Sequence, residues 1–297
     1  MVFNHPIGVR FPVGPPNSFM KFLRVGNLGH EKPAIIDDNG NLRDLSTIVC
    51  DLVPQTINFE TINKLKKINF NSLPKLSSTA RIGACVKNAG KFIGIGLNFS
   101  DHAIEQNLPI PKEPIIFSKA TSSIIGPFDN IEIPSNSKKT DWEVEIALVV
   151  GKKAKNIPES QSKQYIFGYC IVNDISERDF QKNRGGQWIK GKSSDTFGPI
   201  GPYLVTTDEI PDVQNLNMHL DVNNKRMQTG HTSKMIFNIN YILSYLSNFM
   251  TLLPGDIVTT GTPAGVGDGK KPPVYLKKGD NIRLEIEKLG YQLHDVK

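Results

Sequence analysis

The sequence predicts an α+β protein in which β-strands predominate. From residue 91 onward, short apolar segments alternate with clusters of Gly, Pro, Asn and Asp, which is typical of strands joined by turns. Only one long segment has the apolar spacing of an amphipathic helix. The sequence contains no repeated strand–helix–strand rhythm and no internal repeat. Together these observations favour a β-sandwich, roll or barrel.

Length and composition narrow the functional classes. The 297 residues suit one large domain, or a large and a small one. The 35 basic and 29 acidic side chains are spread along the chain without a basic block, which argues against nucleic-acid binding. No apolar run approaches the roughly 20 residues that span a bilayer, so a membrane protein is not expected. Cys50, Cys85 and Cys170 form neither a disulfide framework nor a zinc pattern, which favours a reducing compartment, the cytoplasm.

The first 19 residues differ from the rest of the chain. They are rich in Pro and Gly, and they precede a second methionine, Met20. They lack the charged start, apolar stretch and cleavage site of a secretory signal. We interpret residues 1–19 as a disordered extension or a remnant of cloning, with the folded chain beginning near Met20.

Residues 20–87 are expected to form a small amino-terminal α+β domain. Residues 21–25 have the composition of a strand. Residues 34–36 and 42–45 flank the dipeptide Asn39-Gly40, which favours the positive φ angles of a two-residue hairpin turn. A short helix is predicted over residues 60–68, because Ile62, Leu65 and Ile68 share one side of it. This part of the chain carries few candidate chemical groups.

Residues 88–297 are expected to form the catalytic, metal-binding domain. One helix is predicted from Ile239 to Met250, where apolar residues recur at helical spacing and Pro254-Gly255 closes the segment. The predicted strands are 91–96, 114–118, 143–150, 166–173, 202–206, 217–222, 256–260 and 281–287.

The segment DWEVEIALVVG, from Asp141 to Gly151, is the most informative. Its apolar run 146–150 predicts a buried strand, and Glu143 and Glu145 lie at the start of that strand. Residues two apart on a strand project to the same face, with Cα atoms about 6.5–7 Å apart. Two partly buried carboxylates so close repel each other unless a cation lies between them, so a divalent metal site is one interpretation. The alternative is an exposed strand edge, where both glutamates meet water.

A third acidic residue, Asp174, follows the predicted buried strand 166–173. Two neighbouring strands would bring its carboxylate beside the two glutamates. Three oxygen ligands favour Mg²⁺, Mn²⁺ or Ca²⁺ over zinc or copper. The alternative is that Asp174 forms a turn, as Asn-Asp pairs commonly do.

An acid–base pair is predicted after the strand 91–96. Ser100 or Asp101 could cap a short helix, which would place His102 and Glu105 side by side on its surface. A carboxylate beside an imidazole fixes one tautomer and raises the basicity of the ring, as activation of a water requires. The alternative is a surface pair of little energetic consequence.

The segment 177–201 is rich in glycine but lacks the order of a phosphate-binding loop, and nothing in it indicates the start of a helix. Arg178, Gln181 and Lys192 are donors that could bind a carboxylate; the alternative is a solvated basic loop. Farther on, Thr262 belongs to a Gly-rich turn that follows a strand. Its hydroxyl could bind an anion, or the turn could be purely structural.

Six segments, taken in this order, resemble the fumarylacetoacetate hydrolase family: IGLNFSDHAIE, FSKATSSIIGP, DWEVEIALVVG, YCIVNDISERDFQ, GQWIKGKSSDTFGPIGP and LLPGDIVTTGTPAGVG. The resemblance covers about residues 88–297. The earlier segments KFLRVG and GNLRDLS are similar to the amino-terminal domain of the bacterial-type members. Phe99 stands where many relatives carry tyrosine, so no hydroxyl role is expected at that position.

The resemblance implies a mixed β-roll catalytic domain, a homodimer, and Mg²⁺ or Mn²⁺, or else Ca²⁺, in the site. It assigns the metal ligands to Glu143, Glu145 and Asp174, and the water-activating pair to His102 and Glu105. It also implies contacts to the substrate from four side chains that line the site and from a lysine that neutralises its acid group. The four are Lys119, Arg178, Gln181 and Thr262. The lysine is Lys192, which the resemblance places among the catalytic residues with His102 and Glu105, and Arg178 would help it to neutralise the acid group.

The same resemblance implies the chemistry. The metal would chelate a small anionic 2-oxo acid and stabilise the enolate formed when a carbon–carbon bond breaks, while His102 deprotonates a water. We therefore expect hydrolysis of a 2,4-dioxo acid, either an acylpyruvate or a diketo-deoxy sugar acid. The alternatives are an isomerase or decarboxylase of the 2-hydroxyhepta-2,4-diene-1,7-dioate type, a ureidoglycolate lyase, and a non-catalytic metabolite-binding protein.

Overall fold

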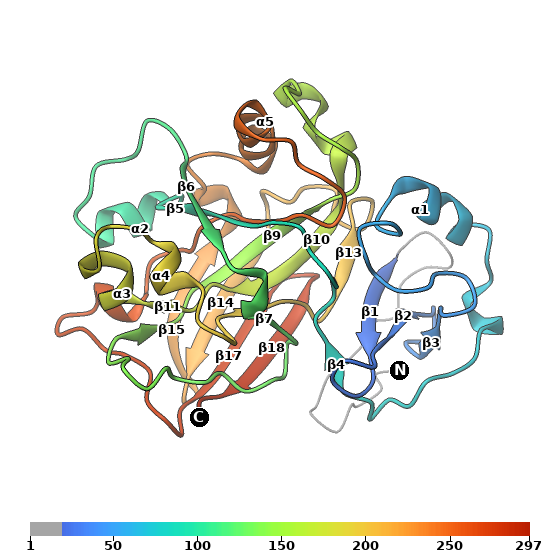
Figure 1. Ribbon diagram of the computed structural model, residues 1–297, viewed down its shortest axis with the longest axis horizontal. Helices are drawn as coiled ribbons and strands as arrows, with labels where there is room; N and C mark the ends of the chain where they lie inside the picture. Colours follow the sequence, from blue (N-terminus) through green and yellow to red (C-terminus); the bar gives the residue numbers. More distant parts are fainter. Residues whose placement is uncertain (1–19) are drawn as a thin grey trace.

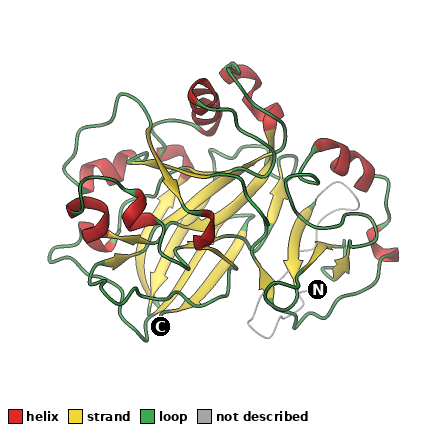
Figure 2. Ribbon diagram, viewed as in Figure 1, coloured by secondary structure: helices red, strands yellow, loops and turns green. Residues whose placement is uncertain are grey.

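The computed structural model describes residues 20–297, so the interpretation of residues 1–19 lies outside the described part of the chain. Two large β-sheets form the centre of the molecule, and the helices lie around them (Figures 1 and 2). The predicted α+β class, mostly β, is confirmed.

The larger sheet is a mixed layer of ten strands. Its neighbouring strands are antiparallel except for one parallel pair, β16 with β5. Strand β4 (Ile82–Gly83) pairs with β1 beside the main path. That path runs β3 (Leu42–Asp44), β2 (Lys32–Ile36), β1 (Lys21–Val25), β13 (Leu204–Thr206), β10 (Ile166–Asn173), β9 (Val144–Val150), β16 (Ile257–Thr259), β5 (Phe92–Gly96) and β6 (Ile115–Lys119).

The second sheet has four antiparallel strands. Their order is β15 (Lys225–His231), β14 (Asn217–Val222), β17 (Asn281–Ile286) and β18 (Gly290–Asp295). Two small ladders pair β11 (Ser176–Glu177) with β8 (Thr140–Asp141) and β12 (Gly198–Pro199) with β7 (Ile124–Ile125).

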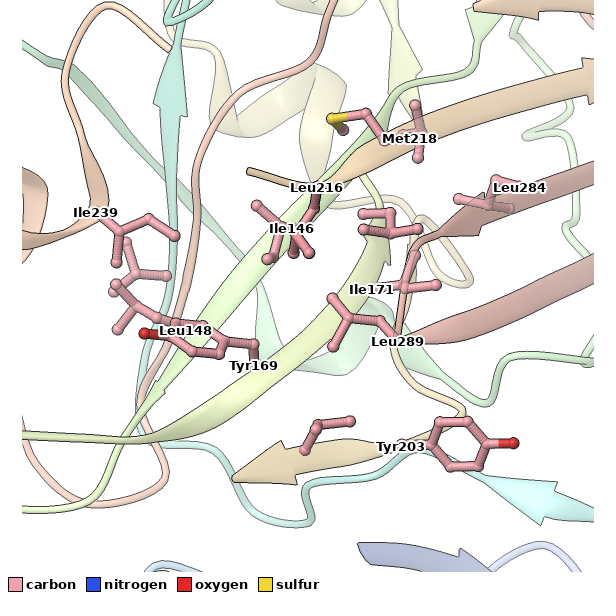
Figure 3. Packing of buried hydrophobic residues seen from close by; sticks show 14 of the residues in the cluster. Ile146, Leu148, Tyr169, Ile171, Tyr203, Leu216, Met218, Ile239, Leu284 and Leu289 are labelled. Carbon is pink, nitrogen blue, oxygen red and sulfur yellow. The ribbon is translucent and has the colours of Figure 1, made fainter. Parts of the chain in front are cut away.

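Side chains alternate between two cores along β9 and β10, because successive residues of a strand point to opposite faces. Ile146 and Ile171 belong to the core shared with the second sheet, where they share a buried cluster with Leu284 (Figure 3). Ala147 and Val172 point to the opposite face and join a second buried cluster. The strands are therefore buried on both faces, which explains their almost continuous apolar sequences.

The amino-terminal segment shares the larger sheet, because Phe22 of β1 is paired with Leu204 of β13. The turn between β2 and β3 differs from the predicted two-residue hairpin. The amide of Gly40 donates to the carbonyl of Asp37, and Gly40 alone has a positive φ, 77°. The Asp37 carboxylate accepts from the amides of Asn39 and Asn41, and this contact stabilises a longer turn.

Helices are short, apart from α5. The predicted helices are present as α1 (Phe59–Leu65), α2 (Ser100–Glu105) and α5 (Ile239–Phe249). Figure 1 shows α2, α3 and α4 on the side of the molecule away from α1. Five 3₁₀ turns complete residues 20–297: Phe70–Ser72, Thr121–Ser123, Glu159–Tyr165, Thr232–Lys234 and Gly267–Gly269. No described helix combines the length and apolar character needed to cross a membrane.

Two further local predictions are wrong. No side chain caps α2: its first turn follows Phe99, and the Asp101 carboxylate accepts from the adjacent His102 amide instead. The segment 177–201 also contains two short helices that were not predicted, α3 (Arg178–Asn183) and α4 (Ile189–Lys192). The Glu177 side chain accepts from the Asp179 amide and so starts α3, a capping role more typical of Asp than of Glu.

Candidate active site

Two adjacent strands bring the three predicted metal ligands together. Val172 of β10 lies opposite Glu145 of β9, and the Asp174 amide donates to the Glu143 carbonyl at 2.9 Å. Glu143 and Asp174 therefore lie where the two strands end, on the face to which Glu145 also points. Their ligating oxygens lie within 4.8 Å of one another, and all three residues are buried. The exposed-edge alternative for the glutamates is therefore wrong.

Three basic side chains surround this cluster. The Lys192 Nζ donates to Glu143 Oε2 and to Asp174 Oδ2, at 2.6 Å in each case. The Lys119 Nζ donates to Asp174 Oδ1 at 2.6 Å, and the Arg178 Nη2 donates to Glu143 Oε1 at 2.7 Å. Burial works to raise the pKa of Glu143, but Lys192 and Arg178 outweigh it and hold this pKa well below its ordinary range.

Glu145 has a different environment. Its Oε2 accepts from the Thr259 hydroxyl and from the Gly261 amide, the latter at 2.8 Å. No basic side chain forms a salt bridge with it within residues 20–297. Burial raises the pKa of Glu145 well above its usual value, and the negative charges of Asp174 and Glu143 raise it further.

The donor set fits a hard divalent cation. All three candidate ligands are carboxylate oxygens, the type that Mg²⁺, Mn²⁺ and Ca²⁺ prefer. A buried carboxylate without a basic partner is costly, and a cation shared with its two neighbours would remove that cost. Glu143, Glu145 and Asp174 are therefore the residues that would hold such an ion.

The predicted acid–base pair lies on α2, at the edge of the same cleft. Leu97 has a φ of 51°, an uncommon value for leucine, in the turn between β5 and α2. The His102 Nδ1 lies 3.0 Å from Glu105 Oε2, and Glu105 Oε1 accepts from the Gly265 amide at 2.8 Å. Glu105 is thus fixed by the Gly-rich turn after β16, and it orients the His102 ring.

Arg178 is held by acidic partners at the start of α3. Its Nε donates to Asp141 Oδ2 at 2.9 Å, and its Nη1 donates to the side-chain Oε1 of Gln181 at 3.1 Å. Asp141 is fixed in turn by the amides of Gly267 and Asp268, at 2.6 and 3.0 Å. The side-chain oxygen of Gln181 is therefore bound to Arg178. The side-chain NH₂ group of Gln181 is then directed away from the guanidinium.

The Thr262 hydroxyl is bound within the protein. It donates to the Val144 backbone carbonyl at 2.9 Å and accepts from the side-chain Nε2 of Gln228 at 2.8 Å. The side-chain Oε1 of Gln228 also accepts from the Val144 backbone amide at 3.0 Å. Thr262 and Gln228 thus clamp the backbone between Glu143 and Glu145, and the hydroxyl proton of Thr262 is already in use.

These groups surround one cleft with a volume of about 140 Å³. The predicted residues that line it are His102, Glu143, Glu145, Asp174, Arg178, Gln181, Lys192 and Thr262. Two predicted residues do not line the cleft but contact residues that do. Lys119 is buried against Asp174, and Glu105 contacts His102.

Sequence reasoning missed two residues that organise the site. Asp141 is the first residue of the DWEVE segment, so its place next to the glutamates was a usable signal. Gln228 belongs to β15, whose sequence KRMQTGH is mostly polar and has no apolar alternation. A lone buried glutamine in such a strand gives no signal in the sequence.

A family model, described as the fumarylacetoacetate (FAA) hydrolase C-terminal domain, matches residues 91–297. The chain is 54% identical over 275 residues to a protein of Burkholderia orbicola (strain MC0-3) that carries only a provisional hydrolase name. That match covers 92% of this chain and 98% of the relative.

Solved structures show the same similarity. A fumarylacetoacetate hydrolase from Exiguobacterium antarcticum is 34% identical, with a TM-score of 0.82, and covers 94% of this chain and 99% of its own. A 5-carboxymethyl-2-hydroxymuconate delta-isomerase from Mycobacterium smegmatis is 30% identical, with a TM-score of 0.75 and coverage of 93% and 98%. A maleylpyruvate hydrolase from Sphingobium sp. SYK-6, in complex with manganese(II) and pyruvate, is 26% identical, with a TM-score of 0.78 and the same coverage.

Proposed function

The chain belongs to the fumarylacetoacetate hydrolase family, and we propose that it is a divalent-metal-dependent hydrolase. Its substrate would be a 2,4-dioxo acid of the acylpyruvate or diketo-deoxy sugar acid type, cleaved at a carbon–carbon bond. The metal would be Mg²⁺ or Mn²⁺.

The observation that carries this proposal is the buried carboxylate cluster inside a cleft that also contains an acid–base pair. The ligating oxygens of Glu143, Glu145 and Asp174 lie within 4.8 Å of one another, and His102 lines the same cleft. A metabolite-binding protein would need the cation site alone. A histidine held by a carboxylate serves proton transfer, which binding does not require.

The protein groups divide into two roles. A bound Mg²⁺ or Mn²⁺ supplies Lewis-acid chemistry, which stabilises negative charge on the oxygens of a 2-oxo acid. The Lys192 ammonium and the Arg178 guanidinium add positive charge at the wall of the cleft, where the acid group of the substrate would lie. The Gln181 NH₂ group is the neutral donor at the same wall.

His102 would move the proton. Because Nδ1 faces Glu105, the other ring nitrogen, Nε2, is the one that can take a proton from a water in the cleft. Glu105 would stabilise the imidazolium that forms, while the Gly265 amide keeps Glu105 in place. The water would then attack the distal carbonyl, and the proton held by His102 would return to the carbon that leaves as the enolate.

Isomerisation is the second candidate function. The solved delta-isomerase is 30% identical to this chain, and the match covers 93% of this chain. The same His102–Glu105 pair could move a proton at C3 of a 2-oxo acid without adding water. Hydrolysis is preferred because a relative 54% identical to this chain carries a provisional hydrolase name, and the fumarylacetoacetate hydrolase matches at 34%.

The test is a screen of the metal-supplemented protein against acylpyruvates, diketo-deoxy sugar acids, oxaloacetate, ureidoglycolate and unsaturated dioate isomers. Products are identified by mass. We expect two acid fragments from a 2,4-dioxo acid and loss of turnover on chelation. An isomer of unchanged mass would favour the second candidate, and turnover that survives chelation would exclude the metal.

A variant separates proton transfer from metal binding. His102→Ala should lower the rate by roughly a hundredfold or more, the usual contribution of a general base. The affinity for Mn²⁺ should stay unchanged, because His102 is not part of the carboxylate cluster. An undiminished rate would remove His102 from the mechanism.

Three further expectations belong to this proposal. The protein would act in the cytoplasm, as a homodimer, and without nucleic acid. The free thiols of Cys50, Cys85 and Cys170 support the first of these. Measurement of the molar mass in solution tests whether the protein is a homodimer.

A further inference from the structure

One side of the cleft is an apolar wall. Phe117 and Ile115 of β6 line it, together with Trp188, which precedes α4. The Phe117 and Trp188 rings lie 5.6 Å apart between centroids. Trp188 packs directly on Gly96, where an added Cβ would lie only 2.3 Å from the indole ring. The close approach to Gly96 seats the indole against the cleft wall.

This wall adjoins the charged end of the cleft. The Lys192 Nζ lies 4.9 Å from the centroid of the Phe117 ring, and the same nitrogen contacts Glu143 and Asp174. An acid bound by its carboxylate near Lys192 would therefore extend its remaining carbons along Phe117 toward Trp188. Leu108, half exposed, lies at the open end of this path.

Every basic side chain that lines the cleft already has an acidic partner. Arg178 contacts Asp141 and Glu143, and Lys192 contacts Glu143 and Asp174. Lys182, at the rim, contacts Asp268 at 2.6 Å, and His102 contacts Glu105. Lys192, which contacts the apolar wall at Phe117, belongs to the carboxylate cluster.

The charge balance leads to the same result. The buried cluster holds four acidic residues, Asp141, Glu143, Glu145 and Asp174, against three basic ones, Lys119, Arg178 and Lys192. With all seven groups charged, as a bound cation would favour, the cluster has one negative charge in excess, and a divalent cation would leave one positive charge. One substrate carboxylate neutralises that charge, and a second would be buried without compensation.

We propose that the acid bound here carries a single carboxylate, and that its far end is a short hydrocarbon or aryl group packed against Phe117, Ile115 and Trp188. This inference rests on the proposed function and narrows it. Among 2,4-dioxo acids, it selects acylpyruvates with an uncharged acyl group over diacids and over polyhydroxylated sugar acids.

The test measures binding rather than turnover. The Mn²⁺-loaded protein is titrated with three 2-oxo acids that cannot be hydrolysed: pyruvate, 2-oxohexanoate and 2-oxoadipate. The last two share one carbon skeleton and differ by a terminal carboxylate. Each buried methylene strengthens binding about fourfold, so 2-oxohexanoate should bind at least about tenfold more tightly than pyruvate. It should also bind about tenfold more tightly than 2-oxoadipate.

Two variants assign the effect to the wall. Trp188→Ala should reduce the preference for 2-oxohexanoate over pyruvate by about fivefold or more. Leu108→Arg places a charge at the open end and should raise the affinity for 2-oxoadipate relative to 2-oxohexanoate. Leu28→Arg, at an exposed leucine in the amino-terminal segment, is the matched control and should leave both ratios unchanged.

The outcomes separate the two proposals. If 2-oxoadipate binds as tightly as 2-oxohexanoate, or Trp188→Ala leaves the preference intact, the inference about the far end is wrong while the proposed function stands. If pyruvate and both longer acids fail to bind the Mn²⁺-loaded protein, the proposed function itself is wrong, and the inference falls with it.

Discussion

Two networks of charged side chains in this molecule use the same residue types for different purposes, one structural and one functional. The first, the junction network, is the chain of contacts Lys87–Asp51–Arg24–Glu31–Arg81–Asp129, which holds three bases and three acids. It ties β1 and the amino-terminal loops to the loop after β7. The second is the carboxylate cluster of the candidate active site, with Lys119, Arg178 and Lys192 around it.

Acid and base alternate along the junction network. The Arg24 Nε lies 2.7 Å from Asp51, and its Nη2 lies 3.2 Å from Glu31. The Arg81 Nη1 lies 2.8 Å from Glu31, and its Nη2 lies 2.5 Å from Asp129. Burial works against the charged forms, but the arginines outweigh it, so the pKa values of Glu31 and Asp51 lie below their ordinary range.

The site network is not closed in this way. Among residues 20–297, the Glu145 carboxylate accepts hydrogen bonds only from the neutral donors Thr259 and Gly261, and burial together with its acidic neighbours raises its pKa. The difference teaches how to separate a structural charge network from a functional one. The bases of the junction network neutralise its acids, whereas the site leaves the buried Glu145 carboxylate without a basic partner, as the proposed cation site would require.

The largest expected effect comes from Glu145→Gln. The affinity for Mn²⁺ should fall by at least about a hundredfold, because a charged ligand is lost from a set of three. The free energy of unfolding of the metal-free protein should not fall, since a neutral amide ends the repulsion with Glu143 and Asp174. Calorimetric titration with Mn²⁺ and denaturant unfolding measure the two quantities.

The control for this variant is Glu132→Gln, at an exposed glutamate. It should leave both quantities unchanged. Mn²⁺ at a hundred times its dissociation constant should add about 2.7 kcal/mol to the unfolding free energy of the wild type and of this control. The comparison breaks if Glu145→Gln binds Mn²⁺ normally, or if it unfolds far more easily without metal.

A smaller, opposite effect is expected from Glu31→Gln in the junction network. Glu31 accepts from two guanidiniums and its side chain is only 6% exposed, so its loss leaves both arginines short of a partner. The unfolding free energy should fall by about 1–3 kcal/mol, the range for buried hydrogen bonds to charged groups. The affinity for Mn²⁺ should not change.

The exposed Glu60 on α1 provides the matched control, Glu60→Gln, and denaturant unfolding is the measurement. A fall in Mn²⁺ affinity after Glu31→Gln would show that the two networks are coupled. In that case the junction could not be described as purely structural.

The contrast also explains which features could be predicted from the sequence. The carboxylate cluster was predictable because strand alternation puts Glu143 and Glu145 on one face, and Asp174 ends the adjacent buried strand. Lys192 reaches the same cluster through the packing of α4 against β6 and β11, which no local pattern indicates. The composition of the segment 177–201 made Lys192 a candidate carboxylate donor, and the family resemblance assigned it to the site.

The junction network and Gln228, which binds Thr262, had no sequence signal at all. Arg24 and Glu31 are charged residues in ordinary strand and turn segments, and they meet Arg81 only after the sheet forms. Gln228 lies in a polar strand, β15, which the search for apolar alternation missed. Contacts between residues far apart in sequence depend on strand order, and spacing alone does not determine strand order.

The smallest expected effect is a pH dependence that separates the two networks. The folded-state pKa of Glu31 lies below its ordinary value, because the hydrogen bonds and charges of Arg81 and Arg24 outweigh burial. The unfolded chain therefore binds more protons as the pH falls through about 4.3. The stability that Glu31 contributes is fully present above this value and is lost below it.

Glu31→Gln has no such proton to bind, so its unfolding free energy should approach that of the wild type between pH 5.5 and pH 3.5. Denaturant unfolding of both proteins at four pH values in this window measures the difference, and Glu60→Gln should follow the wild type throughout. A constant difference between the wild type and Glu31→Gln would mean that Glu31 contributes through its shape and not its charge. Charge neutralisation within the junction network would then not be what distinguishes this network from the carboxylate cluster of the candidate active site.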